Sequence, residues 1–296
     1  MCRLAPYCFF LLITLAPAAW GSSITLLLSE NTGPYAEFAA TLGEVLDSSR
    51  WKITVSGEPS GQRADLIISA GGEALQRALA AGGTTPIIAT LLPRQSYEKI
   101  IALSGQQRTR ITAIYLDQPP ARQASFLRSL LPDVKRVGML FSSETRWQAS
   151  QYRQAFKNVG LILDSEESDT PNTLLPAISA LLPRINALLA VPDGTIYKRD
   201  NIKAILVTSY RHQRPVVAFS APFVNAGALA ALHTTPAQIA RQTAELINNM
   251  GAVLPPPMPP SHFAITINSS VARALDLSIP DEAAIRRAML VESEAR

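Results

Sequence analysis

Short apolar runs alternate with helix-length segments along the first half of the chain, and one strand with its helix occupies about thirty residues. Most runs are apolar without alternation, which is typical of strands covered on both faces of a parallel sheet. The predicted strands span residues 24–28, 51–56, 65–69, 86–90 and 111–115, with a helix from 35 to about 46 and another that Gly71 and Gly72 open and that runs to about 81. Repeated strand and helix units of this kind predict parallel βαβ units and a first α/β lobe.

The same pattern restarts after Asp117. Asp117 is the predicted N-cap of a helix with Pro119 and Pro120 in its first turn, and we place the crossover to a second lobe here. Further strands are predicted over 136–141, 161–163, 187–191 and 215–219, and helices over 145–158, 171–182 and 196–212. The expected fold class is therefore α/β, with two doubly wound parallel-sheet lobes.

The C-terminal part of the chain carries the clearest helix signals. Thr235 and Gln238 predict a capping box around Pro236, and Gly251 marks the helix end. The run Pro255–Pro260 cannot be helical and predicts an extended connector returning toward the first lobe, followed by a strand over 263–268 and a short helix. These boundaries predict a first lobe of residues 22–116 completed by about 261–296, a second lobe of 117–254, and a connector of 255–260.

Residues 1–21 are predicted to be a secretory signal peptide. Arg3 precedes an apolar core from Tyr7 to Leu15, and small residues follow, so cleavage is expected after Ala18 or Gly21. The alternative is a membrane anchor, but the apolar run is shorter than the roughly 20 residues that a span needs. Both cysteines, at positions 2 and 8, lie in this segment, so the mature chain would have no disulfide and no lipid-anchor cysteine. The predicted location is the periplasm.

Composition narrows the possible functions. Charged residues at 17% and apolar residues at 47% exclude wholesale disorder, and a scattered net charge of +4 gives no support for nucleic-acid binding. The three histidines form no H-E-x-x-H pair, and the chain lacks the motifs of serine hydrolases and P-loop NTPases. We therefore expect a binding protein without a metal, a cofactor or a catalytic site.

Polar residues at the ends of the predicted strands are the candidate ligand contacts, because ligands of open α/β sheets bind at the carboxyl ends of the strands. Carboxylates could accept an ammonium group, while hydroxyl groups and backbone N–H groups near a glycine pair could donate to a carboxylate. The alternative is that these residues only cap helices or form tight turns. The candidates are Ser29, Glu30, Asn31, Gly71, Gly72, Thr90, Ser142, Ser143, Glu144, Asp193, Thr195, Ser220 and Phe223.

Asp193 is the strongest of these candidates. It lies at a strand end beside Gly194, and Thr195 could cap the following helix in its place. Asp193 would then face the cleft and pair with a ligand ammonium group, whereas the alternative makes Asp193 itself the cap. Tyr35, Trp147 and Phe223 could stack on an aromatic ligand or equally pack within the lobes.

Three neighbouring motifs carry a family resemblance: Val191-Pro-Asp-Gly-Thr195, Pro215-Val-Val-Ala-Phe-Ser220 and the segment from Val224 to Ala231. With residues 111–115, 130–141 and 265–280, the chain resembles the substrate-binding proteins of ABC importers, a family that includes tryptophan- and tyrosine-binding proteins. The resemblance implies a type I periplasmic-binding-protein fold, in which two lobes joined by a hinge close on a ligand. It also aligns Asp193 with a cleft loop.

The partners that this resemblance implies are a small-molecule ligand, with an amino acid or related carboxylate as the best expectation, and the membrane permease of an importer. A receptor that reports its ligand to a membrane sensor is the alternative, and a monomer is expected. The turns over 70–72, 90–93 and 141–146 differ from the family pattern, and the last of them lacks the usual Asn-Pro opening. Because the family's ligand contacts lie in these regions, the resemblance supports the fold more strongly than it supports the identity of the ligand.

Overall fold

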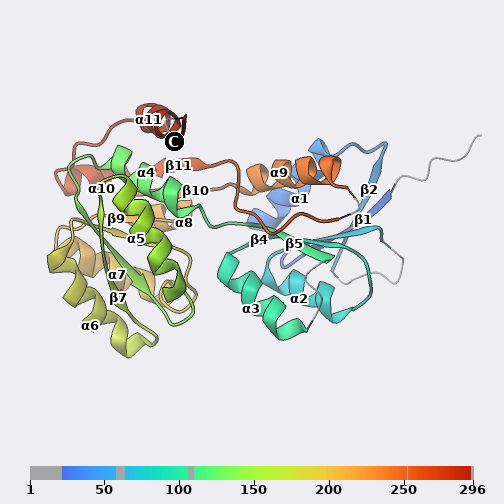
Figure 1. The fold of residues 1–296 in the computed structure, drawn as a ribbon, viewed down its shortest axis with the longest axis horizontal. Helices are drawn as coiled ribbons and strands as arrows, with labels where there is room; N and C mark the ends of the chain where they lie inside the picture. Colours follow the sequence, from blue (N-terminus) through green and yellow to red (C-terminus); the bar gives the residue numbers. More distant parts are fainter. Residues whose placement is uncertain (1–21, 58–63, 106–109, 252, 295–296) are drawn as a thin grey trace, which may run out of the picture.

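The computed structural model describes residues 22–57, 64–105, 110–251 and 253–294, which form two α/β lobes linked by three crossing segments (Figure 1). The predicted signal peptide, residues 1–21, lies outside the described residues. The first sheet is parallel throughout and has the strand order β2-β1-β3-β4-β5. Its strands are β1 (Ser22–Leu28), β2 (Trp51–Ser56), β3 (Leu66–Ala70), β4 (Ile87–Leu92) and β5 (Ile111–Tyr115).

Helices cover both faces of this sheet because its central strands are apolar on both sides. They are α1 (Gly33–Val45), α2 (Gly72–Ala80), α3 (Arg94–Ser104) and α9 (Pro236–Asn249). One apolar cluster joins α1 and α9 to the sheet, and another joins α2 and α3 to its other face. The predicted helices at 35–46 and 72–81 are confirmed, whereas α3 was not predicted.

The second sheet has the order β11-β10-β9-β8-β6-β7. Its strands are β6 (Arg136–Phe141), β7 (Ile162–Glu167), β8 (Ala187–Leu189), β9 (Val216–Ala218), β10 (Ala230–His233) and β11 (Ala264–Ile267). The pairs are parallel except that β11 is antiparallel to β10. In each lobe the first strand lies between the second and the third, so each sheet has a topological switch point beside its first strand. The predicted fold class, with two parallel-sheet α/β lobes, is confirmed.

Two layers of helices enclose the second sheet. One contains α4 (Pro120–Leu130), α5 (Ala149–Asn158), α10 (Ser269–Ala274) and α11 (Glu282–Glu294), and the other contains α6 (Pro171–Leu181), α7 (Arg199–Arg211) and α8 (Ala221–Asn225). Short 3-10 turns, η2 (Arg146–Gln148) and η3 (Leu182–Arg184), precede α5 and follow α6. None of the helices in the described part of the chain has the length and apolarity that a membrane crossing requires.

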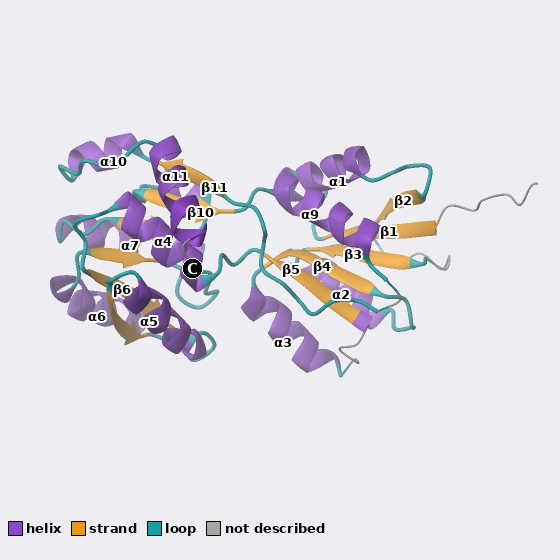
Figure 2. Ribbon diagram, turned by 45° about the horizontal axis from the view of Figure 1, so that its top comes forward, coloured by secondary structure: helices purple, strands orange, loops and turns teal. Residues whose placement is uncertain are grey.

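Two predicted domain assignments are wrong. Helix α9 was assigned to the second lobe, but Figure 2 shows it beside α1, and its buried Ile239 and Ala240 join the apolar cluster of the first sheet. Residues 261–296 were predicted to complete the first lobe, but β11 pairs with β10 and α11 packs on α4. The sequence contains the apolar faces of these elements, but it does not say which lobe each face covers.

The proline-rich connector runs along the edge of β5 and leads from the first lobe to the second, opposite to the predicted direction. Met258 is the one residue of Pro255–Pro260 that has a backbone N–H, and it donates to the Ala113 carbonyl at 2.8 Å. The Met258 carbonyl accepts from Tyr115 N at 3.0 Å. Strand-like pairing is therefore confined to this single position of the run.

The three crossing segments are hydrogen bonded to one another where they pass between the lobes. Gln118 of the first segment donates to the hydroxyl of Thr234 in the second, and that hydroxyl donates to the His262 carbonyl of the third at 3.1 Å. Arg122 at the start of α4 donates to the Pro260 carbonyl at 2.8 Å. Thr235 caps α9 through the predicted capping box with Gln238, which is confirmed. These bonds join the three crossing segments to one another between the lobes.

Candidate functional site

The predicted residues of the first lobe meet at its switch point, where their polar atoms bond to one another. Gly71 has φ +95, and a Cβ there would lie 2.4 Å from the Ser29 hydroxyl oxygen, so this close approach requires glycine. The Ser29 hydroxyl accepts from Ala74 N at 3.1 Å, and Thr90 donates to the Ser69 carbonyl at 3.2 Å. Glu30 and Asn31 are exposed in the loop before α1, and Gly72 is the first residue of α2. The alternative interpretation as a tight turn accounts for these contacts, with the Ser29 hydroxyl capping α2.

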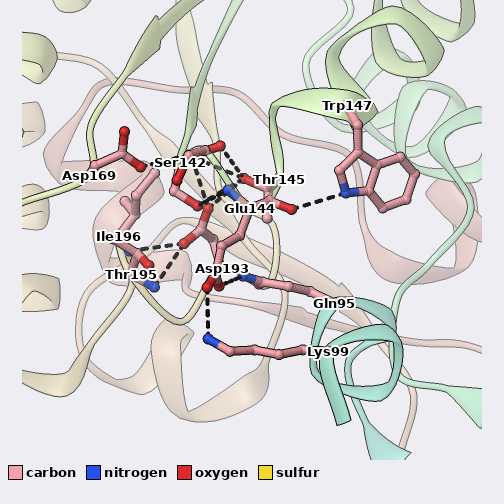
Figure 3. Close-up of polar contacts among 11 residues, drawn as sticks. Gln95, Lys99, Ser142, Glu144, Thr145, Trp147, Asp169, Asp193, Thr195 and Ile196 are labelled. Carbon is pink, nitrogen blue, oxygen red and sulfur yellow. Dashed lines mark hydrogen bonds and ion pairs between the residues drawn. The ribbon is translucent and has the colours of Figure 1, made fainter. Parts of the chain in front are cut away.

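Asp193 occupies the equivalent place in the second lobe, and its side chain is 3% exposed. One carboxylate oxygen accepts from Thr195 N at 2.8 Å and Ile196 N at 3.0 Å. The other accepts from Ser142 N at 3.1 Å and the Thr145 hydroxyl at 2.5 Å (Figure 3). Four protein donors leave no capacity for a ligand ammonium group, so the prediction that Asp193 faces the cleft is wrong. Its role is structural, as in the alternative, but it closes the turn to Ile196 rather than capping a helix.

The other candidates of the second lobe also serve the fold. Thr195 does not cap the next helix, since α7 begins at Arg199 without a side-chain cap. Ser143 N donates to exposed Asp169 at 2.6 Å, and Ser220 precedes α8 without capping it. Phe223 is 2% exposed and packs against Tyr197 and Phe219, with ring centroids 6.0 and 5.7 Å away. The prediction that Phe223 stacks on a ligand is therefore wrong, because its ring belongs to the core.

A cavity of about 350 Å³ lies between the lobes beside the first crossing segment. Both lobes contribute to its walls: α3 and the end of β5 from the first, and η2 and α5 from the second, with prolines of the crossing segments closing one side. Its volume falls within the ~300–1,000 Å³ of small-molecule sites. The residues that carry its chemistry are Arg94, Glu98, Tyr115, Asp117, Trp147 and Tyr152. Of the residues predicted to contact a ligand, the cavity includes only Trp147.

Arg94 is the first residue of α3, and its guanidinium carbon lies 4.6 Å from the Trp147 ring centroid and 5.9 Å from that of Tyr115. Such cation–π contacts stabilise a guanidinium without neutralising it. Within the described residues, the Arg94 side chain has no hydrogen bond or ion pair, and its Nε is buried without a partner. A half-buried cation without an anion loses hydration that the two aromatic rings replace only in part. The cavity is therefore prepared for a negatively charged group.

Asp117 lies next to Arg94 but does not serve the helix it was predicted to cap. Helix α4 begins at Pro120 without a side-chain cap, whereas the Asp117 Oδ2 accepts from Arg94 N at 2.6 Å and so caps α3. Burial raises the pKa of Asp117 to about 6, although the hydrogen bond from Arg94 and the Arg94 charge both lower it. Burial likewise raises the pKa of the Tyr115 and Tyr152 hydroxyls, which stay protonated at neutral pH.

Glu144 connects the two lobes at the mouth of the cavity. Its carboxylate accepts from Lys99 Nζ at 2.7 Å and from the Gln95 amide, both on α3, while its backbone carbonyl accepts from Trp147 Nε1 at 3.0 Å (Figure 3). The turn that carries Trp147 is thus bonded to the helix that begins with Arg94. Glu144, Arg94 and Trp147 also line an adjoining opening. The Lys99 and Glu144 side chains are 61% and 39% exposed, so their ion pair positions the lobes more than it stabilises them.

Sequence reasoning missed Arg94 because strand β4 is longer than predicted. The strand was ended at Thr90, but it continues to Leu92 through an irregular pairing in which Leu91 has φ 53. Pro93 then precedes the first residue of α3. Applying the strand-end rule at Leu92 would have pointed to Arg94.

Comparisons with known proteins agree with this architecture. The family model of ABC transporter substrate binding proteins matches residues 52–290. A Streptococcus pneumonia ABC domain in complex with L-Trp has a TM-score of 0.60 and 18% identity, over 90% of this chain and 98% of that chain. The ligand-free, open structure of a Clostridium difficile substrate binding protein with adhesive properties has a TM-score of 0.65 and 16% identity, over 88% of this chain and 96% of that chain.

A conserved domain protein from Vibrio cholerae has a TM-score of 0.58 and 18% identity, over 90% of this chain and 97% of that chain. No curated protein sequence matches the chain. Among the residues that the structure describes, no group of histidine, cysteine and acidic side chains could hold a metal ion. The matches confirm the family resemblance of the motifs and the two-lobed fold.

Proposed function

The chain belongs to the family of ABC transporter substrate-binding proteins, and on that premise we propose that it is the receptor of an importer and holds a small carboxylate-bearing solute between its lobes. The observation that carries this proposal is the Arg94 guanidinium in the interlobe cavity, which has no hydrogen-bond or ion-pair partner among the described residues. A guanidinium presents a planar fork of donors that matches a carboxylate, and a charge-assisted pair of this kind is strongest where water is excluded. Amino acids are the first class to test, because one structure of the same fold was solved with L-Trp.

Capture would use groups from both lobes. Arg94, Tyr115 and Asp117 belong to the first lobe and its crossing segment, while Trp147 and Tyr152 belong to the second. A solute that contacts both sets stabilises the arrangement in which the lobes meet, which is the usual basis of hinge closure in binding proteins. The proposed activity is therefore binding and release, without chemistry on the solute.

The proposed setting is the periplasm, where a soluble receptor would deliver its solute to a membrane permease as a monomer. The predicted signal peptide supports this setting from the sequence alone. Intact-mass measurement of the exported protein is expected to show loss of all residues up to Ala18 or Gly21. A full-length chain retained in the membrane would contradict export.

The test of binding is a thermal-shift screen of amino acids and small organic acids on the chain beginning at Ser22, followed by calorimetry. A ligand that binds the folded state raises its melting temperature. Arg94→Gln is expected to weaken affinity by more than about thirtyfold, because losing one partner of a desolvated charge pair costs about 2–5 kcal/mol. Arg153→Gln on the exposed face of α5 removes the same charge outside the cavity and is the matched control. Carboxylate binding that survives Arg94→Gln would contradict the proposed site.

A further inference from the structure

We propose that Glu144 of the second lobe and helix α3 of the first form a latch that keeps the two lobes together without a ligand. The latch consists of Glu144 with Gln95 and Lys99, supported by the stacking of Trp147 on Arg94. Each of these contacts joins protein to protein, so the latch does not depend on a solute in the cavity. The receptor therefore rests with its lobes together, and a ligand selects an arrangement that the protein already occupies.

Helix α3 presents two donors to Glu144 on one of its faces. Gln95 and Lys99 are four residues apart, and side chains at this spacing lie on the same side of a helix. The Glu144 carboxylate spans them, with one oxygen accepting from Lys99 Nζ at 2.7 Å and the other from the Gln95 amide (Figure 3). A single carboxylate of the second lobe thus holds two points on a helix of the first.

The turn that carries Glu144 is bonded into the second lobe. Ser142 N donates to the Asp193 carboxylate at 3.1 Å and to the Thr145 hydroxyl at 3.0 Å. The Thr145 hydroxyl donates in turn to Asp193 at 2.5 Å. Because these bonds fix the backbone of the turn, separating it from α3 requires the lobes themselves to move apart.

Trp147 adds an aromatic contact to the latch. Its Nε1 donates to the Glu144 carbonyl at 3.0 Å, and its ring centroid lies 4.6 Å from the guanidinium carbon of Arg94 at the start of α3. The residues of the latch also line the opening beside the cavity. Separation of the lobes therefore widens this opening and uncovers the Trp147 ring, which is 41% exposed when the latch is formed.

The charges of the latch lie near the protein surface, which makes it reversible. The Lys99 and Glu144 side chains are 61% and 39% exposed, and salt screens ion pairs of this kind. Several weak contacts together favour one arrangement of the lobes without preventing the other. The balance between the two arrangements therefore responds to salt and to the charge at position 144.

The experiment follows the arrangement of the lobes in the ligand-free protein. The chain beginning at Ser22 is unfolded in urea, dialysed and refolded, which removes any solute carried through purification. Trp51→Phe leaves Trp147 as its one tryptophan, so acrylamide quenching of fluorescence reports on the latch. Small-angle scattering measures the radius of gyration of the same samples.

Glu144→Lys places like charges across the latch. It is expected to increase the radius of gyration and to raise the quenching constant of Trp147 about twofold, since the population shifts toward separated lobes. Raising sodium chloride to about 0.5 M is expected to move the protein with Glu144 in the same direction, because the ion pair is screened.

A charge swap separates loss of the latch from loss of the fold. Lys99→Glu alone is expected to open the lobes, whereas Lys99→Glu combined with Glu144→Lys restores an ion pair of reversed sign and returns both measurements to their starting values. Glu167→Lys is the matched control, because it reverses an exposed charge whose partner, Arg146, lies 3.4 Å away in the same lobe. It is expected to change neither measurement.

An unchanged radius of gyration and quenching constant in Glu144→Lys would overturn the latch. Equal opening by Glu167→Lys would also overturn it, as would a double variant that fails to recover. Neither measurement uses a ligand, so these results leave the test of carboxylate binding at Arg94 untouched, and the latch and the proposed function can fail independently.

Discussion

Asp193 and Asp117 each follow a strand of a parallel sheet, and burial removes much of each carboxylate from solvent. The two carboxylates differ in how many protein groups donate hydrogen bonds to them. Asp193 accepts from four donors that come from two strand-end turns of the second lobe. Asp117 accepts from Arg94 N and from its own backbone N–H, and the Arg94 side chain beside it has no hydrogen-bond or ion-pair partner within the described residues. The difference shows that a carboxylate at a sheet edge becomes structural when nearby N–H groups point at it, and stays available when prolines replace them.

Replacing Asp193 is expected to have the largest effect, and on stability rather than on binding. Asp193→Ala leaves buried donors without acceptors, each costing about 1–3 kcal/mol, so the free energy of unfolding should fall by about 3–5 kcal/mol. Urea unfolding measures this loss. Asp169→Ala removes a carboxylate at the same edge that is exposed and accepts from Ser143 N, and it should cost far less. A stable Asp193→Ala protein with weakened ligand affinity would show that Asp193 acts in binding rather than in the fold.

The next largest effect is expected in the pH dependence of stability, which tests whether burial raises the pKa of Asp117. Because its pKa in the folded protein, about 6, lies above the ordinary value, its contribution to stability is fully present below pH 4 and is lost as the pH rises through 6. The loss is at most about 3 kcal/mol. Arg94 opposes the shift, and Tyr115 and Tyr152 nearby remain neutral over this range. Unfolding curves at pH 4.5 and 7.5 should therefore differ less in Asp117→Asn than in the unmodified protein. An identical difference in both proteins would mean that other groups govern it.

Arg94→Lys separates the contribution of the positive charge in the cavity from that of the planar guanidinium. Lysine keeps the positive charge but loses the planar fork and its stacking between the Tyr115 and Trp147 rings. Affinity for a carboxylate ligand is expected to fall about tenfold, or roughly 1.4 kcal/mol, which is less than for Arg94→Gln. Calorimetry on Arg94→Lys and Arg94→Gln measures the two losses of affinity. Equal losses would show that the fork contributes nothing beyond its charge.

The smallest effect is expected at the contact between Glu144 and Lys99. A double-mutant cycle of Glu144→Gln and Lys99→Met should give a coupling of about 0.5 kcal/mol in the free energy of unfolding, falling as salt is added, because both side chains are partly exposed. Lys203→Met on the exposed face of α7 controls for removal of a lysine. A coupling that salt does not change would indicate a buried pair instead.

Much of the fold could be predicted from the sequence, because buried parallel strands are short and apolar. The strand ends at Leu28, Ala70 and Phe141 lie where the pattern placed them, give or take a residue or two. The lobe to which α9, β11 and α11 belong could not be predicted, since an apolar face does not specify which sheet it covers. Nor could the cavity, because it forms only where both lobes and two crossing segments meet.

The candidate site was predicted less well than the fold, for two separate reasons. The strand-end rule finds polar residues but does not count the donors around them, so it selected Asp193, while Asp117 was predicted only as a helix cap. Arg94 was hidden by the irregular end of β4 at Leu91, where a left-handed residue has no signature in an apolar run. The prolines after Asp117 were visible, but they were interpreted as helix-start residues rather than as missing donors.

The connector beside β5 has a consequence for how this protein meets its own copies. Strand β5 is the edge of the first sheet, and an open edge is a template on which another chain can add a strand and begin aggregation. Met258 occupies the hydrogen-bonding groups of Ala113 and Tyr115 at that edge, while the prolines on either side of it offer no N–H for a further strand. The segment that carries the chain between the lobes therefore also closes this edge of the sheet against self-association.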